Sequence, residues 1–153
     1  MSENKIDFTG WKAIAVIVVV IGVFGVRLMT LNDKTDDKVL MKDLEVQLIC
    51  DYLPDDAAKL KAVIETGSKD EVERVAKSIT STKLNVDSVQ SSYPLFDFST
   101  HKDVVIKAMY SLIDTSGTRE KRTKYYLYNH GSLGNNWQYK WETSVVRYYL
   151  NFL

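Results

Sequence analysis

A run of fourteen residues without a polar side chain, from Ala13 to Val26, constrains this chain more than any other feature. At about 1.5 Å per residue, a helical run of this length covers roughly 21 Å of a hydrocarbon core about 30 Å thick. The flanking residues lengthen it, because a helix from Trp11 to Leu31 is about 31 Å long. A surface helix of a soluble domain has polar positions along one face, and this run has none. The sequence therefore predicts a transmembrane helix over residues 11–31.

The residues at both ends of the run suit a membrane interface. Trp11 stands where interfacial aromatic side chains gather, and Lys12 and Arg27 are long enough to reach lipid headgroups with their charged ends. A cleaved signal peptide needs small residues at its cleavage site, and the best candidate, residues 23–25, lies inside the apolar run. We therefore expect an uncleaved anchor, with a cleaved signal as the alternative.

The predicted organisation is a tail over residues 1–10, the transmembrane helix, a juxtamembrane linker over residues 32–35 and a soluble domain over residues 36–153. The count of flanking positive charges leans slightly toward a cytoplasmic domain. A short tail, a single span and a folded remainder is nevertheless the usual arrangement of a bacterial signal anchor. We expect a single-pass protein of a bacterial-type inner (plasma) membrane with its soluble domain on the extracytoplasmic side.

Composition excludes several classes of function. Twenty acidic and twenty basic residues give a formal charge of zero, so no global electrostatic attraction to nucleic acid is expected. The single cysteine, Cys50, permits no internal disulfide, and its apolar neighbours predict a buried thiol. Two histidines 29 residues apart, with no cysteine nearby, lack the spacing of a zinc site. We expect no metal and no cofactor.

Three amphipathic helical patterns follow the linker. The first has leucines every four residues and ends at Pro54, and the second ends at Gly67 as its cap. The third opens on Ser68 and Glu71, which have the spacing of a capping box. Each pattern has one apolar face, so the three helices need a partner surface.

The second half of the chain has the patterns of antiparallel strands. Extended segments are predicted from Leu84, over residues 104–112 and over residues 123–129, with a hairpin loop over 114–121 that contains Gly117. These segments predict an α+β fold in which about three short helices cover the concave side of a curved antiparallel β-sheet.

The last predicted strand changes its alternation part-way. Trp137, Tyr139 and Trp141 alternate with polar residues and are expected to share one face of the sheet. From Val146 to Phe152 the apolar residues have the opposite parity. One extra residue near positions 143–144, a β-bulge in a long bent strand, would account for the change.

This order of elements, with the final segment NWQYKWETSVVRYYLNF behind an N-terminal anchor, resembles the cone-shaped fold of the nuclear-transport-factor-2-like superfamily. The resemblance covers about residues 36–153, and a cystatin-like helix-on-sheet domain has almost the same pattern. The superfamily contains isomerases, dehydratases, binding modules and scaffolds, and its membrane-anchored members include secretion-system assembly subunits. Fold alone therefore does not choose a function.

The resemblance also indicates where a catalytic site would be sought. Catalytic members place an aspartate inside the cone, often with a histidine or tyrosine. The segment DFSTHKD offers Asp97 and His101, and His130 lies in a later turn. A His–Asp pair suits general acid–base chemistry, because imidazole titrates near neutral pH. Ordinary loop composition explains the same residues, and we favour that explanation.

Aromatic and basic side chains suggest two candidate surfaces. Eight of the nine tyrosines follow residue 92. They form either the core beneath a curved sheet, which we favour, or a ligand or partner surface of Tyr126, Tyr128, Trp137 and Trp141. A basic run at the hairpin either is solvated or meets lipid headgroups or an acidic partner. It contains Arg119, Lys121, Arg122 and Lys124.

The favoured hypothesis is a non-enzymatic membrane-anchored protein of the cell envelope, in contact with the lipid bilayer, whose domain docks a protein partner or a second copy of itself. The alternative is a small-molecule-binding or enzymatic cone of the lyase or isomerase type. An apolar pocket with an inward carboxylate or imidazole would favour the enzyme, and a filled cone would favour the interaction module. A third option, a module that binds the lipid surface, requires the basic hairpin to lie near the membrane.

Overall fold

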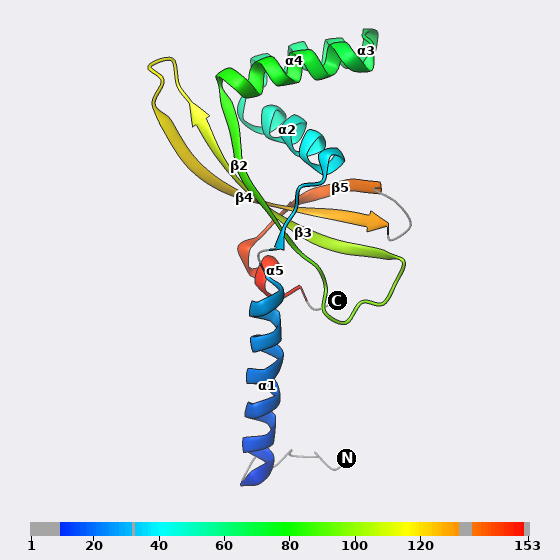
Figure 1. The fold of residues 1–153 in the computed structure, drawn as a ribbon, viewed down its shortest axis with the longest axis vertical. Helices are drawn as coiled ribbons and strands as arrows, with labels where there is room; N and C mark the ends of the chain where they lie inside the picture. The colour runs from blue at the N-terminus through cyan, green and yellow to red at the C-terminus, as the bar shows by residue number, and fades with distance from the viewer. Residues whose placement is uncertain (1–9, 32, 132–135, 152–153) are drawn as a thin grey trace, which may run out of the picture.

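The apolar N-terminal segment forms one straight helix that extends away from the rest of the molecule (Figure 1). The structure is a computed structural model, and it describes residues 10–31, 33–131 and 136–151. Helix α1, Trp11–Thr30, is apolar along most of its length, and Arg27 is its one buried residue. Among the described residues it is the one helix long and apolar enough to cross a bilayer.

Three helices follow, with bounds close to those the sequence predicts. They are α2, Lys38–Tyr52, α3, Pro54–Thr66, and α4, Lys69–Thr82. The Asp37 carboxylate caps α2 by accepting from the backbone N–H of Val39 at 2.8 Å. Pro54 opens α3, where its missing N–H costs nothing. Ser68 precedes α4 as predicted, but its side chain makes no capping bond, so that part of the predicted capping box is not formed.

The strands form one antiparallel meander. Its order is β1, Asp33–Lys34, β2, Leu84–Ser92, β3, His101–Ile113, β4, Arg119–Gly131, and β5, Asn136–Thr143. The β3–β4 turn contains Gly117 at a φ of 82°, a left-handed conformation that favours glycine. The hairpin loop is shorter than predicted, because residues 119–121 already pair with β3 as part of β4.

Helix α2 packs on one face of the sheet. Its leucine stripe contacts inward side chains of β2, β3 and β4. This core contains Leu40, Leu44, Leu48, Leu84, Val89, Val104, Ile106, Ala108, Tyr110, Tyr126 and Tyr128. Helices α3 and α4 pack on the far side of α2 through a second cluster of Ile49, Ala57, Leu60, Ala76 and Ile79. The prediction that three helices cover the sheet is wrong in this respect, because α3 and α4 form an outer layer (Figure 1).

The opposite face of the sheet carries a short helix, α5, Val145–Tyr149. Tyr148 of α5 is buried with Val105 of β3, Leu127 of β4 and Leu31 at the end of α1. The chain therefore has helices on both faces of the sheet, and α5 lies where α1 meets the domain (Figure 1).

The predicted long final strand is wrong after residue 143. The chain stops pairing there and turns into α5, where the Ser144 Oγ accepts from the Arg147 backbone N–H at 3.3 Å. The change of alternation marks a strand-to-helix junction rather than a bulge. Hydroxyl capping at Ser144 and burial of Tyr148 outweigh the strand propensity of this β-branched and aromatic segment.

A β-bulge does occur in β5, but three residues earlier than predicted. Tyr139 pairs with Tyr128 and Trp141 pairs with Leu127, so Lys140 is the extra residue. Because an extra residue reverses the alternation, Trp141 lies on the α5 face, while Tyr139 lies on the α2 face. The prediction that Trp137, Tyr139 and Trp141 share one face is therefore wrong for Trp141.

Cys50 is exposed, which contradicts the prediction of a buried thiol. Its neighbours Leu48 and Ile49 are fully buried, one in each of the two clusters that α2 contacts. Each step along a helix turns by about 100°, so Cys50, the next position, points between the two contact faces toward solvent.

The α+β class is confirmed, whereas the superfamily resemblance stays a prediction.

Candidate functional site

The three candidate catalytic residues lie in separate environments. The Asp97 carboxylate accepts from the backbone N–H of Ser99 at 2.8 Å, in an exposed loop. His101 opens β3, is exposed, and has its Nδ1 3.2 Å from the Thr100 Oγ1. His130, on β4, pairs in register with Lys102. Among the described residues, no hydrogen bond or ring contact joins any two of the three, so they do not form an acid–base pair.

His130 is part of a structural contact between β4, β5 and α2. Its ring stacks on Trp137 with centroids 4.1 Å apart, and the Trp137 Nε1 donates to the Asp37 carboxylate at 3.1 Å. Burial lowers the pKa of His130 and outweighs the attraction of Asp37. Since Asp37 also caps α2, these side chains fix the start of that helix against the sheet.

The two central tyrosines fill the interior rather than line an open pocket. Tyr126 and Tyr128 are fully buried, and their hydroxyls donate to the carboxylates of Asp51 at 2.9 Å and Asp43 at 2.7 Å. Burial, and then the nearby carboxylates, raises the pKa of both hydroxyls, so they stay protonated donors. The two aspartates lie eight residues apart on α2, beside the leucine stripe, and sequence reasoning missed them.

Trp141 lies on the opposite face, where its ring is 49% exposed. Two cations face it: the Arg147 guanidinium at 6.0 Å and the Lys140 ammonium at 5.8 Å from the ring centroid. The four aromatic residues predicted as one surface are therefore divided between a filled core and a half-exposed position.

The basic run does not form one patch. Arg122 pairs with Glu120 at 2.8 Å, and Lys124 pairs with Asp51 at 2.6 Å and with Glu142 at 2.8 Å. Burial lowers the pKa of Lys124, but the hydrogen bonds to the two carboxylates outweigh it and raise the pKa. Alternation along β4 places Arg119 and Lys121 on the other face. This hairpin end lies at the opposite end of the molecule from α1 (Figure 1).

Arg27 is predicted to lie at the membrane interface with its charged end free, but the structure buries its side chain. Trp11 and Lys12 are exposed at the start of α1, whereas the Arg27 side chain is 1% exposed. Its guanidinium is enclosed by the α+β domain and is not available to reach headgroups. Sequence reasoning identified the position but not its role.

The guanidinium of Arg27 donates to groups from two distant segments. Nη1 donates to the Tyr93 carbonyl at 2.6 Å, Nη2 to the Tyr148 carbonyl at 2.8 Å and Nε to the Tyr149 carbonyl at 3.1 Å. Nη2 also contacts the Ser92 Oγ, which itself donates to the Tyr148 carbonyl at 2.7 Å. We call these five residues the anchor junction.

The anchor junction links α1, the end of β2 and α5 through hydrogen bonds. Asn151 adds to it by donating from Nδ2 to the Ser92 carbonyl at 2.7 Å and the Asp103 carbonyl at 3.0 Å. Leu31 is buried against the sheet just after α1. Because an arginine has five N–H donors in a fixed fork, one side chain satisfies several carbonyls that would otherwise be buried without partners.

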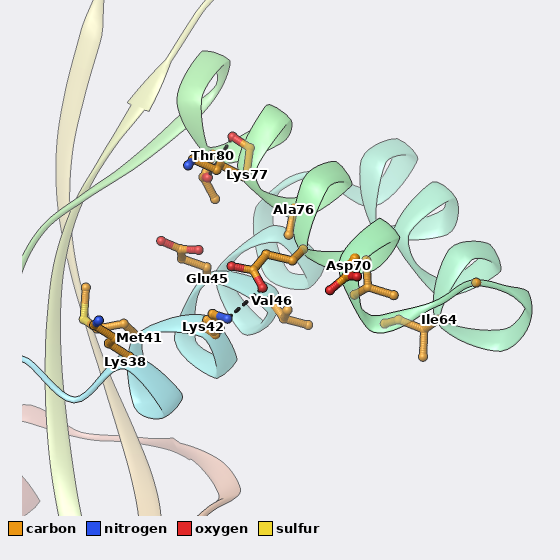
Figure 2. Close-up of a pocket in the computed structure, with 13 residues that line it drawn as sticks. Lys38, Met41, Lys42, Glu45, Val46, Ile64, Asp70, Ala76, Lys77 and Thr80 are labelled. Atoms are coloured by element: carbon orange, nitrogen blue, oxygen red, sulfur yellow. Dashed lines mark hydrogen bonds and ion pairs between the residues drawn. The ribbon is translucent and has the colours of Figure 1, made fainter.

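A groove lies between α2 and α4 (Figure 2). Its volume is about 830 Å³, and it ends at the α3–α4 connection. Met41, Val46, Ile64, Val72 and Ala76 supply its apolar lining. Charged residues of both signs surround them: Lys38, Lys42, Glu45, Asp70, Glu73 and Lys77. We call this surface the α2–α4 groove.

One ion pair crosses the groove. The Lys42 ammonium on α2 lies 2.8 Å from the Glu73 carboxylate on α4 (Figure 2). Burial raises the pKa of Glu45, which lies one helical turn from Lys42, and the charge of Glu73 raises it further against the attraction of Lys42. The groove therefore already holds a partly desolvated carboxylate, as binding surfaces often do.

The groove and the junction contain no arrangement suited to a metal. Within the described ranges, no group of three or more His, Cys, Asp or Glu side chains is placed to hold an ion.

In comparisons with protein-family models, curated proteins and solved structures, nothing matches this chain.

Proposed function

We propose that this protein is a single-pass membrane protein whose α+β domain is a protein-interaction or assembly module of the cell envelope. The observation that carries the proposal is the construction of α1. This helix is apolar on all sides and exposed, yet its last turns are built into the domain through the anchor junction. Exposed apolar surface of this extent is stable in lipid and costly in water.

The anchor junction also supports an uncleaved anchor over a cleaved signal. The best candidate cleavage site ends at Gly25, two residues before Arg27. Cleavage there would remove most of α1 and leave Arg27 as the second residue of the new chain, without the helix that positions its guanidinium against the carbonyls of Tyr93, Tyr148 and Tyr149. A domain that uses the end of α1 in its own core is expected to retain it.

The α2–α4 groove supports the interaction role. An apolar lining framed by both positive and negative charges suits a protein segment with one apolar face and mixed charge. It does not suit nucleic acid, which needs a predominantly basic surface. The cone that the enzymatic alternative needs is filled, because the buried tyrosines occupy the space beneath α2. The partly desolvated carboxylate of Glu45 in the groove is a feature that an enzyme could use, but among the described residues no imidazole lines the groove beside it.

Site-specific photocrosslinking of the full chain in its native membranes tests this role. A photoreactive residue at Lys77, which lines the groove, is expected to give a protein adduct. The matched control is Arg74, exposed on the same helix and absent from the groove lining, which should give none. The adduct mass separates a second copy from another protein. Equal labelling at both positions, or none at either, would contradict the groove as the docking surface.

We also propose that the domain lies on the extracytoplasmic side of a bacterial-type inner membrane, because a single apolar helix ahead of a folded domain is the usual arrangement of a signal anchor. Protease added outside spheroplasts should degrade the domain, while a cytoplasmic marker protein survives. Survival of the domain would reverse the orientation and leave the anchor and the groove unaffected.

A further inference from the structure

The segment between β2 and β3, residues 93–100, lies against the predicted membrane helix. An apolar hollow of about 380 Å³ separates the two, lined by Val19, Gly22, Val23 and Val26 of α1 and by Leu95 and Phe96 of the segment. We call this segment the β2–β3 loop. It lies at the end of the domain from which α1 extends (Figure 1).

The β2–β3 loop exposes large aromatic side chains at this position. Phe98 is 91% exposed and Phe96 is 51% exposed, within the short sequence LFDF. A loop normally carries polar side chains at its surface, so two exposed phenylalanines in a loop that contacts α1 through Leu95 and Phe96 form an unusual apolar surface. That surface extends the exposed apolar side of α1 onto the domain.

The depth of the β2–β3 loop in the bilayer follows from its contact with α1. From Val26 to Val19, α1 rises by about 10 Å along its axis. These residues belong to the apolar run, so in a spanning helix they lie inside the bilayer. Side chains of the loop that share a hollow with them must reach the acyl chains.

The polar groups of the β2–β3 loop suit a position at the boundary of the hydrocarbon. Pro94 is buried and has no backbone N–H. The Asp97 carboxylate accepts the Ser99 N–H at 2.8 Å, and the Ser99 Oγ donates to the His101 carbonyl at 2.5 Å. The Tyr93 carbonyl accepts from Arg27. Backbone groups satisfied in this way lower the cost of approaching the hydrocarbon.

We propose that the β2–β3 loop is a second membrane-contact element. Phe96 and Phe98 enter the boundary between headgroups and acyl chains, and a lipid acyl chain fills the hollow between the loop and α1. This inference rests on the proposed membrane anchoring. Together with the anchor junction, the loop fixes the domain at one height and orientation on the bilayer, instead of leaving it free to swing on a linker.

Depth-dependent fluorescence quenching on the full chain tests the proposal. Cys50 is changed to serine, and single cysteines are introduced by Phe98→Cys, Val19→Cys or Ser116→Cys, the last at the distant β3–β4 turn. Each variant carries an environment-sensitive fluorophore and is reconstituted into vesicles of phosphatidylcholine and phosphatidylglycerol. Quenching by lipids spin-labelled on their acyl chains is compared with quenching by aqueous iodide.

The labels at positions 98 and 19 are expected to be quenched by the acyl-chain spin labels and shielded from iodide, and the label at 116 should show the reverse. Iodide quenching at 98 with lipid quenching at 19 would overturn the loop proposal while the anchor stands. Shielding of 98 from both quenchers would show that protein, not lipid, covers the loop, and would also overturn it. Iodide quenching at 19 would overturn the anchor itself, and the loop proposal with it.

Discussion

Arg27 connects the two physically different parts of this chain. A guanidinium is always charged, and its burial is tolerated only when its donors are used. Here Nε, Nη1 and Nη2 all donate to domain groups, so the charge at the end of an apolar helix becomes an attachment point. A lysine at this position would offer one ammonium and could not reach carbonyls in the same fork arrangement.

Replacing Arg27 with methionine is expected to destabilise the domain by at least about 3 kcal/mol, because each buried acceptor left unsatisfied costs about 1–3 kcal/mol. Thermal unfolding of the full chain in detergent micelles, followed by near-UV circular dichroism, measures the change. Arg27→Lys should fall between wild type and Arg27→Met.

Lys12→Met is the matched control for Arg27, since Lys12 is a long cation exposed near the other end of the same helix. It should leave the unfolding temperature of the domain unchanged. If Arg27→Met unfolds at the wild-type temperature, the guanidinium does not hold the domain to α1.

Glu45 makes the folded domain less stable at neutral pH. Its pKa lies above the usual 4.5 chiefly because it is partly buried, so the folded chain binds this proton more tightly than the unfolded chain. Its contribution to stability is therefore fully present below pH 4.5 and is lost as pH rises through the folded pKa. Glu45→Gln should raise the unfolding temperature at pH 7, and the gain should shrink as the pH is lowered toward 4.

The difference between wild type and variant isolates this effect from other carboxylates, such as Asp56, whose pKa is lowered by Lys83 and which act in the opposite direction. Glu65→Gln, on the exposed surface of α3, serves as the control. A gain for Glu45→Gln that does not vary with pH would show that its charge is not the cause.

The residues of the candidate site were predictable only where their role is local. Lys38 to Lys42 and Asp70 to Lys77 lie on helices that the sequence predicts, yet the α2–α4 groove depends on how those helices pack. Arg27 was identified as a flanking cation. Its partners lie 65 to 122 residues away in the chain, and no local pattern indicates them.

At the scale of elements, α2 holds the fold together because it contacts two cores. Its leucine stripe faces the sheet, and Ile49 faces α3 and α4. Two tyrosine hydroxyls of β4 reach carboxylates on α2 at the edges of the first contact. These bonds fix the rotation of α2 about its axis, because a turned helix would break both.

Tyr128→Phe is expected to lower the free energy of unfolding by about 1–2 kcal/mol, since it removes one hydrogen bond to a carboxylate and leaves the ring packing intact. Tyr149→Phe, at a ring 42% exposed on α5, should change it by less than about 0.5 kcal/mol. Chemical denaturation of both variants measures the difference. Equal effects would mean that the Asp43 contact does not stabilise α2 on the sheet.

The sequence predicts the elements better than their packing. Helix bounds depend on the spacing of leucines and on Pro54 and Gly67, which are local signals. The bulge at Lys140 depends on how β5 pairs with Leu127 of β4, and the start of α5 depends on the burial of Tyr148 against the sheet. Strand propensity suggests continuation into the last segment, and only tertiary burial makes it a helix.

The whole molecule has two ends with different character (Figure 1). The anchor junction, α5 and the β2–β3 loop lie at the end from which α1 extends. Helices α3 and α4 and the β3–β4 hairpin lie at the opposite end. A spanning α1 therefore presents the α2–α4 groove to the aqueous side, within reach of a partner, and places the basic hairpin away from the lipid surface. This placement counts against a lipid role for the hairpin.

Membrane extraction combined with the intact mass tests the central claim that α1 is an uncleaved, spanning anchor built into the domain. The full chain should sediment with membranes, resist alkaline carbonate and enter the supernatant only with detergent, with a mass that still includes residues 11–31. A chain that is released by carbonate, or that begins after residue 25, would contradict the account.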